Sequence, residues 1–152
     1  MRPAPVQHPR PPLTIAAHGR VTLKIAAERG DSWNSAPVAG RDMLEGKGLS
    51  VGEALEVTQR RSELLDEQCV GVGRDPSTIR RSICAVPPPY TLDTPWISTT
   101  AFEEFVERYR RIGITEFIFM CPLEDYYPAD QVQPGIFERI ATQVIPAIQR
   151  SA

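Results

Sequence analysis

No stretch of this 152-residue sequence approaches the roughly 20 consecutive apolar residues that a membrane-spanning helix needs. The first twelve residues, MRPAPVQHPRPP, also lack the apolar core of a signal peptide. The three cysteines are odd in number and have no CxxC spacing, which does not fit a disulfide framework or a zinc site. We therefore expect reduced thiols and a cytoplasmic protein. A formal net charge of −2 gives no overall basic surface for nucleic acid.

The composition is typical of a globular protein, with 41% hydrophobic and 24% charged residues. The length suits one domain with a core of its own. Residues 1–12 contain five prolines and no hydrophobic period, which predicts an extended arm or linker. The folded domain is expected over residues 13–152.

Apolar runs alternate with amphipathic segments along this domain. The run at 114–121 is apolar on both faces, which is typical of a strand covered on both sides in a parallel sheet. Pro146 is expected to kink the last helix. The predicted strands cover residues 13–17, 31–35, 78–86 and 114–121, and the predicted helices cover 20–29, 50–73, 100–112 and 136–148.

Local signals mark the ends of three of these helices. Ser50 and Glu53 fit a capping box at the start of the second helix, and Thr100 and Glu103 fit one at the start of the third. Gly30 is expected to end the first helix in the left-handed conformation. The third helix also has two Glu–Arg pairs at four-residue spacing, Glu104–Arg108 and Glu107–Arg111.

The alternation of four strands with four helices predicts a parallel α/β sheet with right-handed crossovers. An open doubly wound sheet and part of an eight-stranded barrel both fit this order. The pattern alone does not choose between them.

Four segments of the chain resemble, in the right order, segments of the luciferase-like monooxygenases. They are PPLTIAAHGRVTLKIAAERGDSWNS, LLDEQCVGVGRDPSTIRRS, FVERYRRIGITEFIFMCP and FERIATQVIP. This family comprises flavin- or deazaflavin-dependent oxidoreductases that fold as (β/α)8 barrels. The resemblance covers about residues 9–150 and implies that residues 13–152 form four parallel strand–helix units, the C-terminal half of a TIM-type barrel.

Members of the resembled family are about twice this length, so the resemblance implies that the first half of the barrel is missing. An internal start, a gene fragment or a subunit that needs a partner would each account for this. A half-barrel exposes two strand edges and half of a core. We therefore expect a homodimer or association with a complementary half-barrel, and we do not expect this chain to catalyse a reaction alone.

The turn after the first strand is the candidate cofactor site. Barrel enzymes place their sites at the carboxyl ends of the strands, and a helix N-terminus there suits a phosphate. The resemblance implies that the phosphate of FMN or of a deazaflavin lies near Ala17, His18 and Gly19. Arg20 would add a positive charge, and Asn34 would offer a polar contact at the end of the next strand. The alternative is a tight connection that binds no ligand.

Other chemical roles are less well supported. His18 has no evident carboxylate partner in the sequence, so no catalytic residue is named. Glu124, Asp125 and Asp130, with Tyr126 and Tyr127, could be taken for a metal or sugar site. Their spacing supports no ligand set, and a solvated loop is the preferred interpretation.

The leading hypothesis is the C-terminal portion of a luciferase-like flavin-dependent oxidoreductase or monooxygenase that acts on a small organic substrate. This portion would contribute the cofactor-phosphate side of the site. The alternative is a non-catalytic half-barrel that dimerises or binds a partner chain. A third hypothesis is a small open α/β binding domain unrelated to barrels.

Overall fold

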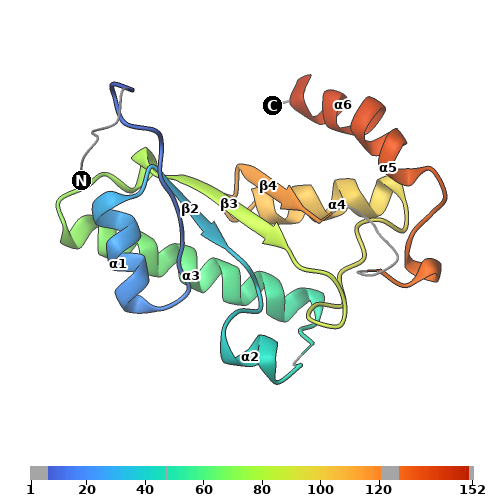
Figure 1. The fold of residues 1–152 in the computed structure, drawn as a ribbon, viewed down its shortest axis with the longest axis horizontal. Coiled ribbons are helices and arrows are strands. Elements are labelled where there is room, and N and C mark those ends of the chain that lie inside the picture. The colour runs from blue at the N-terminus through green and yellow to red at the C-terminus, as the bar shows by residue number, and fades with distance from the viewer. Residues whose placement is uncertain (1–6, 47, 121–126, 151–152) are drawn as a thin grey trace.

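The computed structural model describes residues 7–46, 48–120 and 127–150. Its centre is a four-stranded sheet in which all neighbouring strands are parallel and follow the order of the chain (Figure 1). The strands are β1 (Thr14–Ala16), β2 (Ser32–Ser35), β3 (Arg80–Ala85) and β4 (Glu116–Phe119).

Helices follow each strand, as the alternation predicts. A 3-10 turn, η1 (Pro76–Thr78), leads into β3, and another, η2 (Ala129–Gln131), precedes the last helix. The α-helices are α1 (Arg20–Arg29), α2 (Arg41–Leu44), α3 (Val51–Gly71), α4 (Thr99–Arg110), α5 (Ile136–Arg139) and α6 (Ile145–Arg150). The five residues η3 (Ile140–Val144) join α5 to α6 in π-helical geometry.

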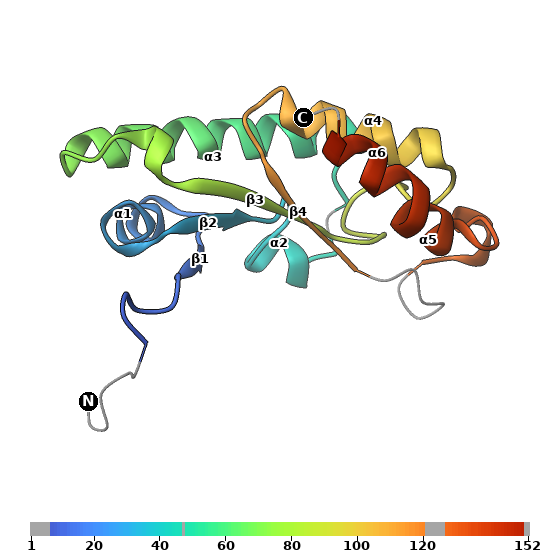
Figure 2. The same cartoon turned by 90° about the horizontal axis from the view of Figure 1, so that it is seen from above.

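One face of the sheet is covered by helices and carries the main core. Figure 2 shows α3 and α4 along this face. Trp33 from β2 and Ile83 from β3 are fully buried there among residues of α1, α3 and α4. The helix residues of this core are Leu23, Ala26, Ala27, Leu65, Cys69, Phe105 and Tyr109. Burial of this apolar face is the main source of stability for such an arrangement.

The other face, which we call the second face, carries the alternate residues of each strand, among them Asn34, Ser82 and Glu116, which share a register. The sequence predicts that the last strand is apolar and covered on both sides. That prediction is wrong for the second face, where Ile118 is 47% exposed. The helices pack on one side of β4 only, so its other side has no cover from the described residues. Residue 121, the predicted end of this strand, lies outside the described residues.

Two predicted helix ends differ from the structure. Gly30 ends α1 in an extended conformation with φ −78° rather than a left-handed one. There is no room for a side chain at this position, because an added Cβ would lie 2.8 Å from the carbonyl oxygen of Ala26. At α4 the cap is Ser98, whose hydroxyl accepts from the amide of Ala101 at 3.0 Å, and not Thr100. The Ser50–Glu53 capping box of α3 is confirmed.

The last helix departs from α-geometry just before Pro146, the expected site of a kink. The amide of Ile145 donates to the carbonyl of Ile140, five residues earlier. Proline has no N–H to give the next bond of an α-helix, so the widened turn comes where the α-helical bonding is interrupted.

Candidate functional site

The turn between β1 and α1 lies at the carboxyl end of the sheet, as the sequence predicts. Ala17 is buried there, and both of its backbone polar groups are used within the protein. Its amide donates to the carbonyl of Asn34 at 3.2 Å, and its carbonyl accepts the indole N–H of Trp33 at 2.8 Å. Ala17 therefore shapes the turn but has no free donor for a ligand.

The first turn of α1 is exposed. Gly19 is extended, and an added Cβ there would have only the Thr22 hydroxyl within 4.0 Å, so the approach to its backbone is open. Its own amide donates to the Thr22 hydroxyl at 3.2 Å. The amides of Arg20 and Val21, as first-turn positions, have no intrahelical acceptor. The Arg20 side chain is exposed beside them and forms no ion pair with any residue in the described part of the chain.

His18 joins the ends of β1 and β2. Its Nε2 accepts the amide N–H of Ala36 at 3.1 Å, so the ring proton of the neutral form lies on Nδ1. Partial burial, and to a lesser degree the positive charge of Arg61, lower the pKa of His18 below its ordinary value of 6.5. The imidazole is therefore neutral at physiological pH, and its bonding partner is a backbone amide rather than a carboxylate.

Arg61, on α3, holds the segment that receives this contact. Its guanidinium donates to the carbonyl of Ala36 at 2.5 Å and to that of Pro37 at 3.3 Å. Ala36 is thus held on its amide side by His18 and on its carbonyl side by Arg61. No sequence pattern predicts this arrangement, because two of its bonds use the backbone of a residue without a functional side chain.

Asn34 lies on the second face, one strand over from the turn. Its side-chain amide donates to the Ser82 hydroxyl at 2.9 Å, and that hydroxyl donates to the carbonyl of Trp33 at 3.0 Å. On the same face, Arg80 donates to Glu116 at 2.8 Å. Asn34 is only partly buried. The second face thus carries two pairs of polar side chains, each bonded within the pair.

The loop that follows β4, with its possible metal or sugar site, lies mostly outside the described residues. Residues 121–126, which include Glu124, Asp125 and Tyr126, lie outside the described residues. Tyr127 is buried, and burial raises the pKa of its phenol. Asp130 is exposed. No group of three or more possible metal ligands occurs in residues 7–46, 48–120 and 127–150.

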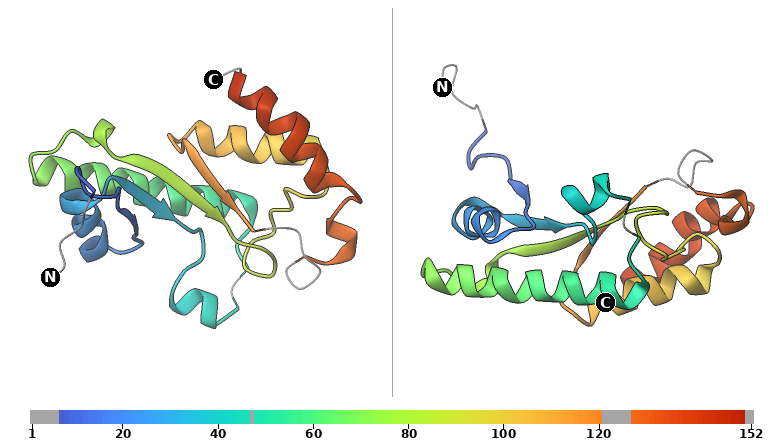
Figure 3. Two further views of the ribbon diagram at one scale, coloured as in Figure 1. Left: turned by 45° about the horizontal axis from the view of Figure 1, so that its top comes forward. Right: turned by 90° about the horizontal axis from the view of Figure 1, so that it is seen from below.

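An apolar cavity that the sequence does not indicate lies beside β4, at the other edge of the sheet from the turn. Its volume is about 340 Å³, and a smaller one of about 160 Å³ shares Phe102, Phe119 and Ile145 with it. The larger cavity lies between α4, β4 and α6, which Figure 3 shows together at one end of the molecule. Its lining comprises Phe102, Val106, Arg110, Thr115, Glu116, Phe117, Phe119, Ile145, Ile148 and Gln149.

Comparison of the sequence with protein-family models and with curated proteins gives no match. The structure, however, is similar to that of an F420-dependent secondary alcohol dehydrogenase in complex with an F420–acetone adduct, with a TM-score of 0.59 and 14% sequence identity. The similarity covers 93% of this chain and 50% of the dehydrogenase chain. The chain has the fold of half of a (β/α)8 barrel.

This similarity confirms the predicted fold class, four parallel strand–helix units equivalent to half of a barrel. The half-barrel spans about half the length of the solved structure that it matches. At this level of identity the match establishes the fold alone. In the part of the chain that the structure describes, no helix is both long and apolar enough to cross a membrane.

Proposed function

We propose that this half-barrel contributes the cofactor-phosphate side of a flavin- or deazaflavin-dependent oxidoreductase, corresponding to the C-terminal portion of a luciferase-like enzyme. The observation that carries the proposal is the exposed first turn of α1 at the carboxyl end of a sheet with this fold. An F420-type deazaflavin is the preferred cofactor, because the similar dehydrogenase is described as F420-dependent. FMN is the second candidate.

The residues of the turn fit a phosphate group. The amides of Arg20 and Val21 have no helical acceptor, and a helix N-terminus carries roughly half a positive charge. The space next to Gly19 is open, so an anion can come close to the backbone. The guanidinium of Arg20 would add a full positive charge with several donors. Ala17, with both of its polar groups engaged, would position the turn rather than bind.

His18 and Asn34 would take supporting roles. The Nδ1–H of neutral His18 is a donor suited to a phosphate or a solvent molecule, while its Nε2 anchors the turn to Ala36. Asn34 lies partly exposed on the second face and would give a polar contact to the cofactor beyond its phosphate.

The bound cofactor would supply hydride transfer, and this chain would bind and orient it. We assign no catalytic residue to the half-barrel. Contacts to a small organic substrate would come mostly from the remainder of the barrel. The loops at the carboxyl ends of the strands are the part of this chain that would border the substrate.

Titration of the purified chain with F420 and with FMN, followed by cofactor fluorescence, tests the proposal. We expect saturable binding that Arg20→Ala weakens by about 5- to 10-fold, equivalent to roughly 1 to 1.4 kcal/mol. Arg29→Ala is the matched control, because it removes the same side chain from the opposite end of the same helix. Absence of binding to both cofactors, or equal loss in both variants, would overturn the proposal.

A non-catalytic half-barrel is the second candidate function. It is favoured by the exposed apolar residues at both edges of the sheet, among them Val21 on α1 and Ile118 on β4. A chain that ignores both cofactors yet associates with a protein partner would support this function instead.

A further inference from the structure

The two edge strands, β1 and β4, have their unpaired edges on opposite sides of the sheet, and these two edges are complementary. Within the described residues, β1 pairs only with β2, and β4 pairs only with β3. Each edge thus presents a row of backbone N–H and C=O groups for another strand. Because all four strands are parallel, the edge of β4 can pair in parallel with a strand of the kind that β1 provides.

We propose that two copies of this chain associate head to tail, with β1 of each copy beside β4 of the other. A rotation of 180° about a common axis places both pairs at once, so the eight strands form a closed ring with no edge left. The matched dehydrogenase chain is twice as long as the matched region, which agrees with eight strands as the complete sheet. This inference does not depend on cofactor binding.

The helices at the two ends of the sheet carry the apolar surface that such a closure would bury. On α1, Val21 and Ile25 are 75% and 47% exposed, and their four-residue spacing puts them on one side of the helix. At the other end, Ile145 on α6 is 36% exposed and lines the cavities beside β4. Figure 3 shows α1 and α6 at opposite ends of the molecule. In the two-copy ring, α1 of one copy lies next to α6 of the other.

The charged residues of the second face do not oppose association of two copies. Among its strand residues only Arg80 and Glu116 are charged, and they are already paired with each other at 2.8 Å. Asn34 and Ser82 are likewise bonded to each other. Two copies of this face therefore bring together no unpaired charge, which is the usual obstacle to burying a polar surface.

A second copy is the occupant that these observations select. Each contact between the two copies, which we call a joint, is made by the β1–α1 end of one copy and the β4–α6 end of the other. Both ends are present on this one chain. Closed two-fold symmetry is also the commonest arrangement of identical chains. A separate complementary half-barrel would use the same edges, and the experiment distinguishes it.

Sedimentation of the full chain, without cofactor and over a range of concentrations, gives the first result. We expect a species of twice the 16.9 kDa chain mass. Ile25→Glu and Ile145→Lys should each shift the protein to the monomer, because each puts an unpaired charge into the joint. Val70→Glu is the matched control, since Val70 is 69% exposed on α3, the helix that connects the two inner strands β2 and β3. Circular dichroism checks that each variant remains folded.

Mixing the two monomeric variants gives the decisive result. One joint of the mixed pair would place the carboxylate introduced by Ile25→Glu against the ammonium introduced by Ile145→Lys, and the other joint would be native. We expect the mixture, and also the double variant, to recover the dimer. A wild-type chain that stays monomeric would overturn the proposal in favour of a separate partner, and so would a mixture that fails to recover.

Discussion

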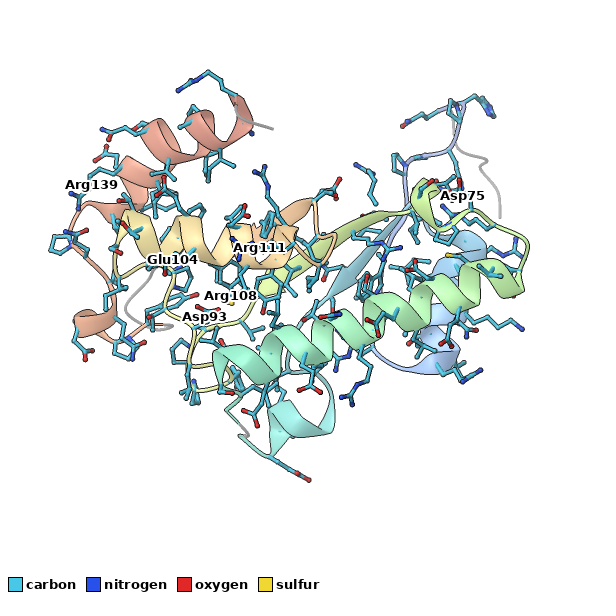
Figure 4. The ribbon with its side chains drawn as sticks, turned by 180° about the vertical axis from the view of Figure 1, so that it is seen from behind. Asp75, Asp93, Glu104, Arg108, Arg111 and Arg139 are labelled. Atoms are coloured by element: carbon cyan, nitrogen blue, oxygen red, sulfur yellow. The ribbon has the colours of Figure 1, made fainter. Side chains whose placement is uncertain are left out.

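Arg108 on α4 donates from one guanidinium nitrogen to both carboxylate oxygens of Asp93, at 3.0 and 2.8 Å. The two side chains are only 26% and 12% exposed, and Figure 4 shows them together where the loop after β3 meets α4. Burial raises the pKa of Asp93 even though the charge and hydrogen bond of Arg108 act to lower it. The pair therefore links the loop to α4. The interaction with Arg108 does not fully offset the hydration that the Asp93 carboxylate loses on burial.

Removing one member of this pair should destabilise the protein more than removing both. We expect Asp93→Leu and Arg108→Met each to lower the free energy of unfolding by about 2–4 kcal/mol, because each leaves a partly buried charge unpaired. The double variant should lose less than the sum by about 1–3 kcal/mol. Urea unfolding at one fixed protein concentration measures this. Additive losses would contradict the account, and the exposed pair Glu107–Arg111 provides a control that should change by less than about 1 kcal/mol.

Gly30 should be intolerant of a methyl group although its backbone angles suit any residue. In Gly30→Ala the new Cβ would lie 2.8 Å from the Ala26 carbonyl oxygen, and we expect a loss of about 1–3 kcal/mol from the overpacking. Gly52→Ala is the control, because nothing lies within 4 Å of a Cβ there. That variant should be neutral or stabilising by up to about 1 kcal/mol. Equal thermal midpoints for the two variants would refute the packing argument.

Titration of His18 should lower the free energy of unfolding in mild acid. Its pKa is lowered in the folded state, so on acidification the unfolded chain takes up a proton first. The contribution of neutral His18 is complete above the ordinary value of 6.5 and is lost as the pH falls below it, through the lowered native pKa. Relative to His18→Gln, which cannot titrate, the wild type should lose stability between about pH 7 and pH 5. Parallel pH profiles of the two proteins would contradict the prediction.

The sequence predicts those parts of the fold that depend on residues close together along the chain. The Ser50–Glu53 box could be predicted because both partners lie within one turn, and the alternation of apolar runs indicated the order of strands and helices. Of the two expected Glu–Arg pairs on α4, only Glu107–Arg111 is present among the described residues. Arg108 pairs instead with Asp93, which lies fifteen residues earlier in a loop that no local pattern describes.

The candidate site shows the same division. The position of the turn after β1 follows from the strand–helix pattern, and the exposure of Gly19 and Arg20 agrees with it. The bond from Ala36 to His18 could not be predicted, because its donor is a backbone amide in the connection that follows the neighbouring strand. The cavity beside β4 likewise depends on how α4 and α6 pack, and packing at that distance leaves no sequence pattern.

The central claim is that the first turn of α1 binds the phosphate of a flavin or deazaflavin. The most direct measurement is amide NMR of the full chain during titration with F420 and with FMN. The account predicts that the amide signals of residues 19–22 shift most, and that inorganic phosphate at high concentration reverses part of the change. Shifts confined to other segments, or none at millimolar cofactor, would contradict it.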